Sequence, residues 1–302
     1  AHYDHLGWGG EGSSSLVPQE RAIHNGADDN ASGVAGLLEV ARLLAARPPA
    51  RSVLFAAFAA EEVGLLGSSY LVQNLPVGRE QVVAMLNMDM IGRPRDGAKL
   101  TVSGVGTATQ WPTLVDAANA ASGLTITTDK GGYGASDHSS FYAAGIPVLF
   151  LFTGAHEDYH RPSDDADRLH YPGMTRVVGF AADLARAMAD LPEPPTFQRV
   201  ATETSGGRRN LKVRTGVIPE FGWEGQGFKI SGVAGGSPAE RAGLKAGDIV
   251  LRFGGREVRN IYDYMYALGD HQPGDEVELL LRRGEQTLTL TITLEAGGGG
   301  RR

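Results

Sequence analysis

The stretch QVVAMLNMD at residues 81–89 decides the fold, because a mostly apolar run ends directly in an acidic residue. Its first eight residues are typical of a strand buried on both faces of a parallel sheet. Asp89 follows at the point where this strand would end. In open α/β sheets, ligands bind outside the carboxyl ends of the strands, so Asp89 is the first candidate for a functional side chain.

Two more apolar runs lie on either side of this stretch in the chain. Residues 51–60 (RSVLFAAFAA) end in Glu61 and Glu62, and residues 146–152 (IPVLFLF) precede a polar loop. Both runs predict buried strands. Apolar residues at helical spacing predict helices over 30–46, 63–75, 110–121 and 175–191. Strands that alternate with helices predict an α/β fold, with a mostly parallel sheet and helices on both of its faces.

A change of composition marks the end of this first domain. LPEPPT at residues 191–196 would break a helix, and TETSGGRR at residues 202–209 is polar. Short strand-like runs follow at 211–218, 228–233, 248–253, 276–282 and 287–294, with helical stretches at 238–242 and 261–268. We therefore expect a domain over 1–192, a linker over 193–209, a small β-rich domain over 210–295 and a flexible tail over 296–302.

Composition and charge exclude several classes of function. The net charge is −7 and no basic stripe offsets it, so a nucleic-acid partner is not expected. No apolar run reaches the roughly 20 residues that span a membrane. The absence of cysteine removes disulfides, thiolate zinc sites and cysteine nucleophiles. Neither a GxSxG nucleophile elbow nor a GxxxxGK[ST] phosphate loop is present.

Acidic and histidine side chains stand at five places where a predicted strand ends, where a predicted helix begins, or in a neighbouring loop. These are His2 with Asp4, Asp28 with Asp29, Glu61 with Glu62, Asp89, and His160. If they converge, the carboxylates would repel one another unless cations neutralised them. Mixed imidazole and carboxylate ligands suit zinc, and other divalent ions remain open. Taken singly, each place also has an ordinary explanation as a helix start, a helix cap, a turn acid or a surface histidine.

Six segments together resemble the co-catalytic dizinc aminopeptidases. They are AHYDHLG (1–7), NGADDNASG (25–33), FAAEEVGLLGSS (58–69), LNMDMIG (86–92), SDHSSF (136–141) and DYHRPSD (158–164). The resemblance covers most of residues 1–190 and keeps the order of all five ligands. It implies the fold of the zinc exopeptidases (phosphorylase/hydrolase-like) and two Zn²⁺ per chain. It implies that His2 and Asp89 hold one ion, that Glu62 and His160 hold the other, and that Asp29 bridges both.

The same resemblance implies three further roles. Asp4 would orient the ring of His2 as a partner behind the metal ligand. Glu61 would be the general base that takes a proton from a metal-bridging water and delivers it to the leaving amine. Tyr159 would donate a hydrogen bond to the developing oxyanion.

HEDYH at residues 156–160 matches the HExxH signature of helical zinc proteases. That signature requires both histidines on one continuous helix, and Gly154 and Pro162 leave little room for one. We interpret the match as chance, with His160 alone as a ligand and Glu61, rather than Glu157, as the base. A role in the substrate cleft is open for Asp137 and His138. The other histidines are interpreted as surface or internally satisfied side chains: His5, His24, His170 and His271.

The second domain resembles the PDZ-like modules appended to bacterial proteases. GQGFKI at 225–230, GGSPAERAG at 235–243 and LKAGDIVL at 244–251 carry this match. It covers about residues 211–294. It implies that Gly225, Gly227 and Phe228 bind the carboxylate of a peptide C-terminus, while the peptide adds to an edge strand at 228–233. A closed groove, or one used only for packing, is the alternative.

The leading hypothesis is hydrolysis of N-terminal residues from peptides, with Glu61 and Asp89 also binding the free α-amine. Three alternatives remain: acyl transfer as in glutaminyl cyclases, carboxypeptidase action, and a catalytically impaired PDZ adaptor. The chain opens at Ala1 and His2 without a signal peptide or leading strand, so we expect it to be N-terminally truncated. We favour a secreted or periplasmic bacterial protein whose export signal lay upstream.

Overall fold

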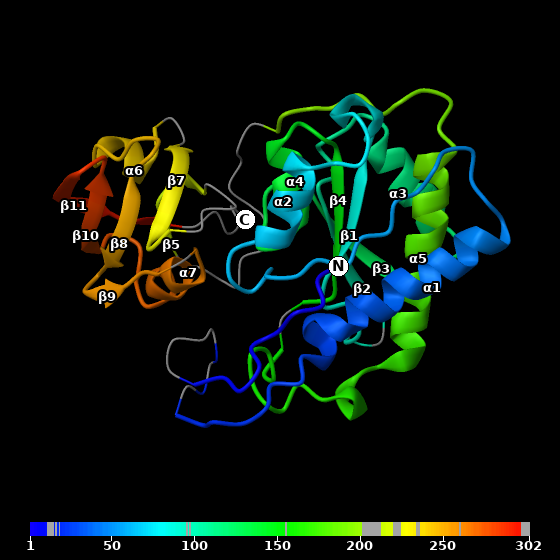
Figure 1. Cartoon of the computed structure of the whole chain (residues 1–302), viewed down its shortest axis with the longest axis horizontal. Helices are drawn as coiled ribbons and strands as arrows, with labels where there is room; N and C mark the ends of the chain where they lie inside the picture. The colour runs from blue at the N-terminus through cyan, green and yellow to red at the C-terminus, as the bar shows by residue number, and fades with distance from the viewer. Residues whose placement is uncertain are drawn as a thin grey trace. The chain divides into compact units, whose positions relative to one another are not determined.

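The computed structural model describes residues 1–10, 15, 17, 19–94, 96, 98–154, 156–200, 213–219, 225–233, 236–259 and 261–296. The chain forms two compact units, Ala1–Ala201 and Thr202–Arg302, and the division falls inside the predicted linker (Figure 1). Part of that linker nevertheless packs on the first unit. Phe197 forms a β-bridge with Ala108, and the N–H of Gln198 donates to the carbonyl of Thr107.

The first unit is built on a four-stranded sheet in the order β1 (Met85–Met88), β4 (Val148–Phe152), β2 (Lys99–Ser103) and β3 (Thr125–Asp129). β1 pairs with β4 in parallel, and β2 pairs with β3 in parallel. The central pairing of β2 with β4 is antiparallel. Two of the three pairings are parallel, so the sheet is mostly parallel, as predicted, with one antiparallel step. The antiparallel step arises at β2, one of two strands that the sequence analysis did not predict.

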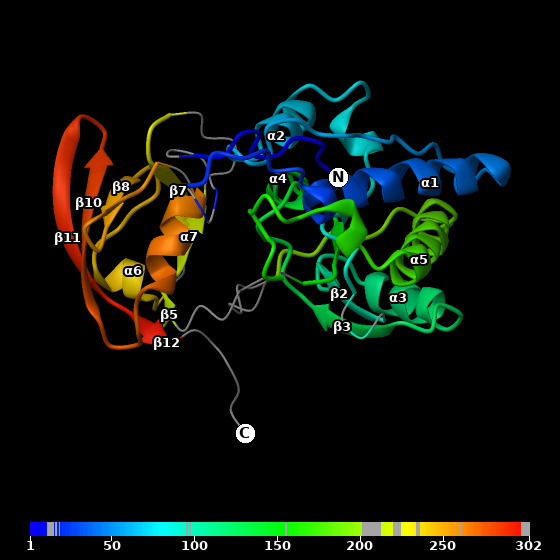
Figure 2. The same ribbon diagram turned by 90° about the horizontal axis from the view of Figure 1, so that it is seen from below.

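Helices cover both faces of this sheet, as predicted (Figures 1 and 2). On one side lie α1 (Gly33–Ala46), α3 (Trp111–Asn119) and α5 (Tyr171–Ala189); on the other lie α2 (Leu66–Gln73) and α4 (His138–Ala143). Short helical turns occur at η1 (Ala27–Ser32), η2 (Arg79–Gln81) and η4 (Ala166–Arg168). The larger core includes the fully buried Trp111, Leu149, Leu151 and Phe180. None of the described helices combines the length and the hydrophobicity that crossing a bilayer requires.

Residues 51–60 do not form the predicted strand. The side chains of Val53, Leu54 and Phe55 are exposed, and no strand of the described chain pairs with this part of the segment. A single parallel bridge joins Phe58 to His2. The N–H of Phe58 donates to the carbonyl of Ala1 at 2.9 Å, and the N–H of Tyr3 donates to the carbonyl of Phe58 at 2.8 Å. An apolar run without a neighbouring strand cannot form the hydrogen-bond ladder of a sheet. The single bridge nevertheless places the N-terminal segment beside Glu61.

The second unit is β-rich, as predicted. Its main sheet has the order β11 (Gln286–Thr293), β10 (Glu276–Arg283), β8 (Ile249–Phe253), β7 (Phe228–Val233) and β6 (Val217–Pro219), with β9 (Arg256–Glu257) also paired to β8. β5 (Val213–Arg214) pairs with β12 (Glu295–Ala296), and the helices are α6 (Pro238–Arg241) and α7 (Ile261–Gly269).

This strand order corrects one expectation. β7 is not an edge strand, because β8 pairs with it on one side and β6 pairs with it on the other. Among the strands that the structure describes, β6 is the last on this side of the sheet. Ala296, the first residue of the predicted tail, belongs to β12, and the rest of that tail (297–302) lies outside the described residues, as do residues 201–209 of the predicted linker.

Candidate metal centre

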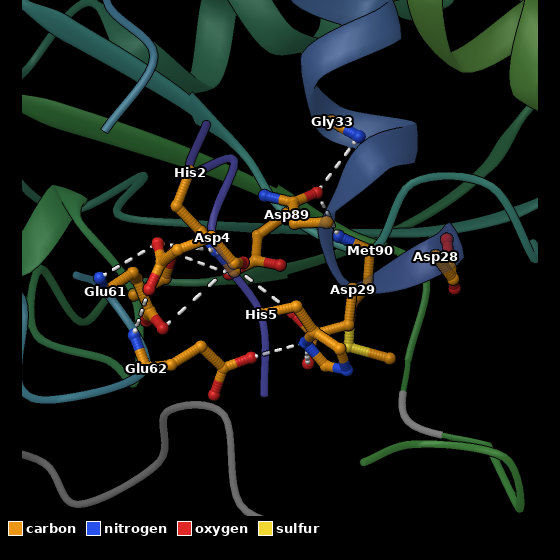
Figure 3. Close-up of polar contacts among 12 residues, drawn as sticks. His2, Asp4, His5, Asp28, Asp29, Gly33, Glu61, Glu62, Asp89 and Met90 are labelled. Carbon is orange, nitrogen blue, oxygen red and sulfur yellow. Dashed lines mark hydrogen bonds and ion pairs between the residues drawn. The ribbon is translucent and has the colours of Figure 1, made fainter. Parts of the chain in front are cut away.

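The side chains of all five predicted ligands meet in one buried site beside the carboxyl end of β1: His2, Asp29, Glu62, Asp89 and His160. Figure 3 shows four of them, with the acidic side chains turned toward one another. Asp89 directly follows β1, and the bridge to Phe58 carries His2 to the same place. Segments far apart in sequence therefore supply a single site.

The two oxygens of Asp29 divide the site into two halves. In one half, Nε2 of His2 lies 3.3 Å from Oδ1 of Asp29 and 3.5 Å from Oδ2 of Asp89. In the other half, Nε2 of His160 lies 3.2 Å from Oδ2 of Asp29 and 3.2 Å from Oε2 of Glu62. Asp29 is thus shared between two imidazole–carboxylate groups.

The backbone around Asp29 is fixed by neighbouring polar side chains. Oδ2 of Asp164 accepts the N–H groups of Asp28 and Asp29 at 3.0 and 3.1 Å. The side chain of Asn30 accepts the N–H of Gly33 at 2.9 Å, at the start of α1. Because Asn30 satisfies this helix N-terminus, the carboxylate of Asp29 does not act as its cap and faces the site.

Asp4 organises the neighbouring pair Glu61 and Glu62. Its two carboxylate oxygens accept the N–H groups of Glu61 and Glu62 at 3.1 and 3.3 Å. Nδ1 of His2 lies 3.2 Å from the Asp4 carbonyl oxygen and 3.6 Å from its carboxylate. α2 begins only at Leu66, so Glu61 and Glu62 do not form an acidic first helical turn. Asp4 therefore fixes the turn that presents both glutamates.

Three residues at or beside the site have left-handed backbone conformations, which are unfavourable for side chains other than glycine. They are Ala60 before Glu61 (φ 58°), Met90 after Asp89 (φ 51°), and His160 itself (φ 54°). Such conformations cost of order 1–3 kcal/mol each and concentrate at functional sites. Here they let consecutive residues depart from regular structure and turn into one crevice.

Asp89 is oriented by a chain of two hydrogen bonds, from Asn87 to Ser136 and from Ser136 to Asp89. Oγ of Ser136 donates to Oδ2 of Asp89 at 2.7 Å, and Nδ2 of Asn87 donates to Ser136 at 2.7 Å. The other oxygen, Oδ1 of Asp89, is buried and has no hydrogen-bond partner among the described residues. The sequence analysis did not assign a role to Ser136 or Asn87, although both lie in segments that carry the family resemblance.

His5 also lies in this site, although the sequence led us to interpret it as a surface or internally satisfied histidine. Its Nδ1 lies 2.7 Å from Oε1 of Glu62 and 4.0 Å from Oδ2 of Asp29, and Figure 3 shows the ring beside both carboxylates. The HxxH spacing of His2 and His5 was the available signal. This spacing alone does not show that the ring of His5, like that of His2, points into the site.

The charges in the site fit bound cations. Four carboxylates, those of Asp29, Glu61, Glu62 and Asp89, are buried together, and burying unneutralised charge is costly. Burial opposes the charged forms of His2 and His160, but the carboxylates outweigh burial and raise the pKa of both rings well above the usual value. Two groups of donor atoms each lie within 4.8 Å of one another: His2, Glu61 and Asp89, and His5, Asp29 and Glu62. This set of nitrogen and oxygen donors suits zinc.

The HExxH segment does not form a zinc-binding helix, in agreement with the sequence analysis. Residues 157–163 form turns and a bend, and Nε2 of His156 lies 3.1 Å from Oδ2 of Asp28. Glu157 is largely exposed, whereas Glu61 is buried. The ring of Tyr159 stacks on His160 at 3.8 Å between centroids. The role predicted for its hydroxyl remains a prediction.

Asp137 and His138 are both buried at the start of α4. Burial raises the pKa of Asp137 to about 6, and it lies close enough to His2 for their charges to interact. Burial lowers the pKa of His138 to about 3. The other histidines have internal partners: His24 with Ser15, His170 with Gly173, and His271 with Asp275.

Known proteins match both units of this chain. The leupeptin-inactivating enzyme 1 of Streptomyces exfoliatus is 38% identical over 149 residues, which are 47% of this chain and 32% of that protein. A probable leucine aminopeptidase of Arthroderma otae is 32% identical over 182 residues, 55% of this chain and 50% of that protein. The chain therefore spans about a third to a half of the length of these relatives.

A solved structure supports the same relationship. The zinc aminopeptidase BSAP from Bacillus subtilis superposes with a TM-score of 0.50 at 29% identity, covering 54% of this chain and 42% of that one. The model of the PDZ domain matches residues 207–294. The model of peptidase family M28 matches residues 1–185, more than half of the chain. Because the peptidase model covers more than half of it, the chain belongs to peptidase family M28, and it carries a PDZ domain after the peptidase domain.

Proposed function

We propose that this chain removes the N-terminal residue from peptides at a centre of two zinc ions. The observation that carries the proposal is the division of Asp29, whose Oδ1 faces His2 while its Oδ2 faces His160. His2 and Asp89 would hold one ion, Glu62 and His160 the other, and Asp29 both. The names of the relatives as aminopeptidases support the substrate class.

Glu61 is proposed to move the proton of the reaction. In the metal-free site, burial and the neighbouring carboxylates of Glu62, Asp89 and Asp137 raise the pKa of Glu61 well above its usual value. A carboxylate with a raised pKa accepts a proton near neutral pH and can return it to the leaving amine. When bound, the ions would lower the pKa of the attacking water and polarise the scissile carbonyl. Tyr159 would donate to the oxyanion, and Glu61 and Asp89 would bind the substrate's α-amine.

The direct test compares Glu61→Gln with Glu157→Gln, using aminoacyl-nitroanilides of several residue types. Glu61→Gln keeps the side-chain size and removes the base, so kcat should fall by about 100-fold or more. Glu157→Gln, the matched control, should leave kcat within about two-fold because its side chain is exposed. Chelator should abolish release by the unmodified chain. The opposite pattern, with only Glu157→Gln inactive, would contradict the assignment of the base.

Two alternatives are separated by the same assay. A glutaminyl cyclase would convert peptides with N-terminal glutamine and leave nitroanilides intact, and a carboxypeptidase would act only on peptides with a free C-terminus. Release of nitroaniline from N-terminally free substrates, lost on N-acetylation, supports the aminopeptidase proposal.

We further propose that the PDZ domain binds a peptide C-terminus along β6. β6 is the outer strand of its sheet among the described strands, and Gly216 before it has φ 80°. Thr215 joins this turn to α7, because its Oγ1 lies 2.6 Å from the hydroxyl of Tyr264. In the loop predicted from the sequence, the N–H of Gly227 already donates to the carbonyl of Arg259 at 3.1 Å. The edge available for strand addition is therefore better placed at β6.

A further inference from the structure

We propose that His5 is a positioning residue of the metal centre. It binds one carboxylate oxygen of Glu62 and leaves the other oxygen for the metal. This inference rests on the proposed two-zinc function. It adds a histidine that does not belong to the five ligands, and it assigns that histidine to one half of the site.

The two oxygens of Glu62 have different partners. Oε1 lies 2.7 Å from Nδ1 of His5, while Oε2 lies 3.2 Å from Nε2 of His160. Because His5 and His160 contact opposite oxygens, the carboxylate cannot turn about its axis without losing the contact to His5. A fixed orientation of this kind is what partners behind a metal ligand provide.

The His5 ring is enclosed on several sides, so its position is well defined. Only 8% of its side chain is exposed, and it meets His160 edge to face at 5.7 Å between centroids. A Cβ atom on Gly26 would come within 2.6 Å of Cγ of His5. Gly26, at φ 60°, therefore lets the backbone pass directly against the ring.

Distances distinguish a positioning role from direct ligation. Donor atoms around a tetrahedral zinc lie about 3.3 Å apart, as follows from metal–donor bonds of roughly 2.0–2.1 Å. The contacts of His160 to Asp29 and Glu62, both 3.2 Å, fit that spacing. The 2.7 Å contact of His5 is shorter and matches a hydrogen bond to a carboxylate, and its distance to Asp29 is 4.0 Å. His5 thus contacts Glu62 as a donor.

Removal of His5 should weaken one of the two ions selectively. Without its ring, Oε1 of Glu62 loses its partner and the carboxylate can rotate, which typically lowers metal affinity 10- to 100-fold. His5 forms its polar contacts with Glu62 and Asp29, and none with Asp89 among the described residues, so the ion held by His2 and Asp89 should keep its affinity. The affected half is the one formed by Glu62 and His160.

The experiment titrates the full metal-free chain with Zn²⁺ against a chromophoric chelator and compares three variants. His5→Ala removes the donor, and His5→Asn keeps an N–H near the position of Nδ1. His24→Asn is the matched control, because His24 is buried 6.4 Å from His5 but bonds to Ser15 and the Ala22 carbonyl. We expect His5→Ala to lower the Zn²⁺ affinity of one of the two binding steps 10- to 100-fold. His5→Asn should restore most of that affinity, and His24→Asn should leave the affinity of both steps unchanged.

Visible absorption of the Co²⁺-loaded chain decides between positioning and ligation. We expect the ligand-field bands of His5→Asn to match those of the unmodified chain, because the ligand set is the same. A changed spectrum together with unrestored affinity would show that His5 is itself a ligand and would overturn the inference. Two unchanged steps in His5→Ala would also overturn it, while leaving the proposed function intact. An unmodified chain that binds no ion would contradict the proposed function itself.

Discussion

Ser136 is one of two side chains that each orient one predicted ligand, in a different half of the site. It donates to Oδ2 of Asp89 and receives a hydrogen bond from Asn87. On the other half, His5 plays the corresponding part for Glu62. Each half thus has its own supporting partner, and Asp29 connects the two halves.

We predict that Ser136→Ala weakens the binding step that His5→Ala leaves unchanged. Loss of the Oγ–H donor frees one oxygen of Asp89, which should lower the affinity for one ion by about 10-fold or more. The same Zn²⁺ titration measures it, and the neighbouring Ser139→Ala is the control, because the Ser139 hydroxyl pairs with the backbone N–H and carbonyl of Gly134. In the double variant of His5 and Ser136, both steps should weaken. If both single variants weaken the same step, the division into halves is wrong.

The five candidate ligands could be singled out from the sequence because each lies in a short motif with fixed order, and their ligation stays a prediction. Their supporting partners could not be predicted in the same way. His5 and Ser136 become recognisable only when Glu62 and Asp89 are brought beside them, over 57 and 47 positions of chain. Hydrogen bonds of this kind have no local sequence signal, because they depend on how the elements pack.

At the scale of elements, long apolar runs predicted structure well only where a neighbouring strand exists. β1 and β4 pair in parallel and are buried, as their composition indicates. Residues 51–60 have the same composition but lack a paired neighbour among the described residues, so they remain irregular. β2 and β3 were missed because both are short and contain polar residues, at positions that are partly exposed. α4 was missed because it is only six residues long.

The packing of α4 on β4 leads to a prediction about pH. The ring of His138 stacks on Phe150 at 4.3 Å between centroids, and burial lowers its pKa to about 3 from 6.5. Between these values the unfolded chain binds a proton that the folded chain does not, so acid destabilises the fold. We expect His138 to reduce the free energy of unfolding by about 1.4 kcal/mol for each pH unit below 6.5.

Calorimetry of the metal-free chain tests this, because acid then cannot act by releasing ions. His138→Phe keeps a ring beside Phe150 and removes the proton, so the stability of the variant relative to the unmodified chain should rise as the pH falls from 6.5 to 4.5. Phe141→Leu, which changes a buried side chain of the same helix without removing a titratable group, should run parallel to the unmodified chain. Parallel curves for His138→Phe as well would show that its ring is protonated in the folded state.

At the scale of the whole molecule, the composition change near residue 191 predicted a second domain, and the two compact units divide between Ala201 and Thr202. It did not show that Phe197 and Gln198 pack on the first unit, since that depends on a bridge to Ala108 and a contact with Thr107. The glycine pattern identified the PDZ domain but placed its binding edge on β7. Which strand ends a sheet follows from strand order, and the order was not evident from the glycines.

We predict that the two units can be impaired separately. Gly216→Val places a side chain at φ 80° beside β6, so the affinity for a peptide with a free C-terminus should fall about 10-fold or more. Turnover of nitroanilides should stay within about two-fold, because the site residues lie between positions 2 and 160. Gly284→Val is the matched control, since it also has a positive φ (60°) but joins β10 and β11 at the other end of the strand order.

Fluorescence titration with a peptide panel, in free-acid and C-terminally amidated forms, measures this binding. Amidation should remove most of the affinity of the unmodified chain. Equal binding of both forms, or equal loss in Gly216→Val and Gly284→Val, would contradict capture of a C-terminus at β6.

The number of zinc ions per chain tests the central claim most directly. The claim is that Asp29 joins two halves, each able to hold an ion, and it can be checked by elemental analysis of the chain after saturation with zinc and removal of excess metal. We predict two zinc ions per chain, and at most one for Asp29→Ala at the same free zinc concentration. One zinc ion in the unmodified chain, unchanged in Asp29→Ala, would contradict it.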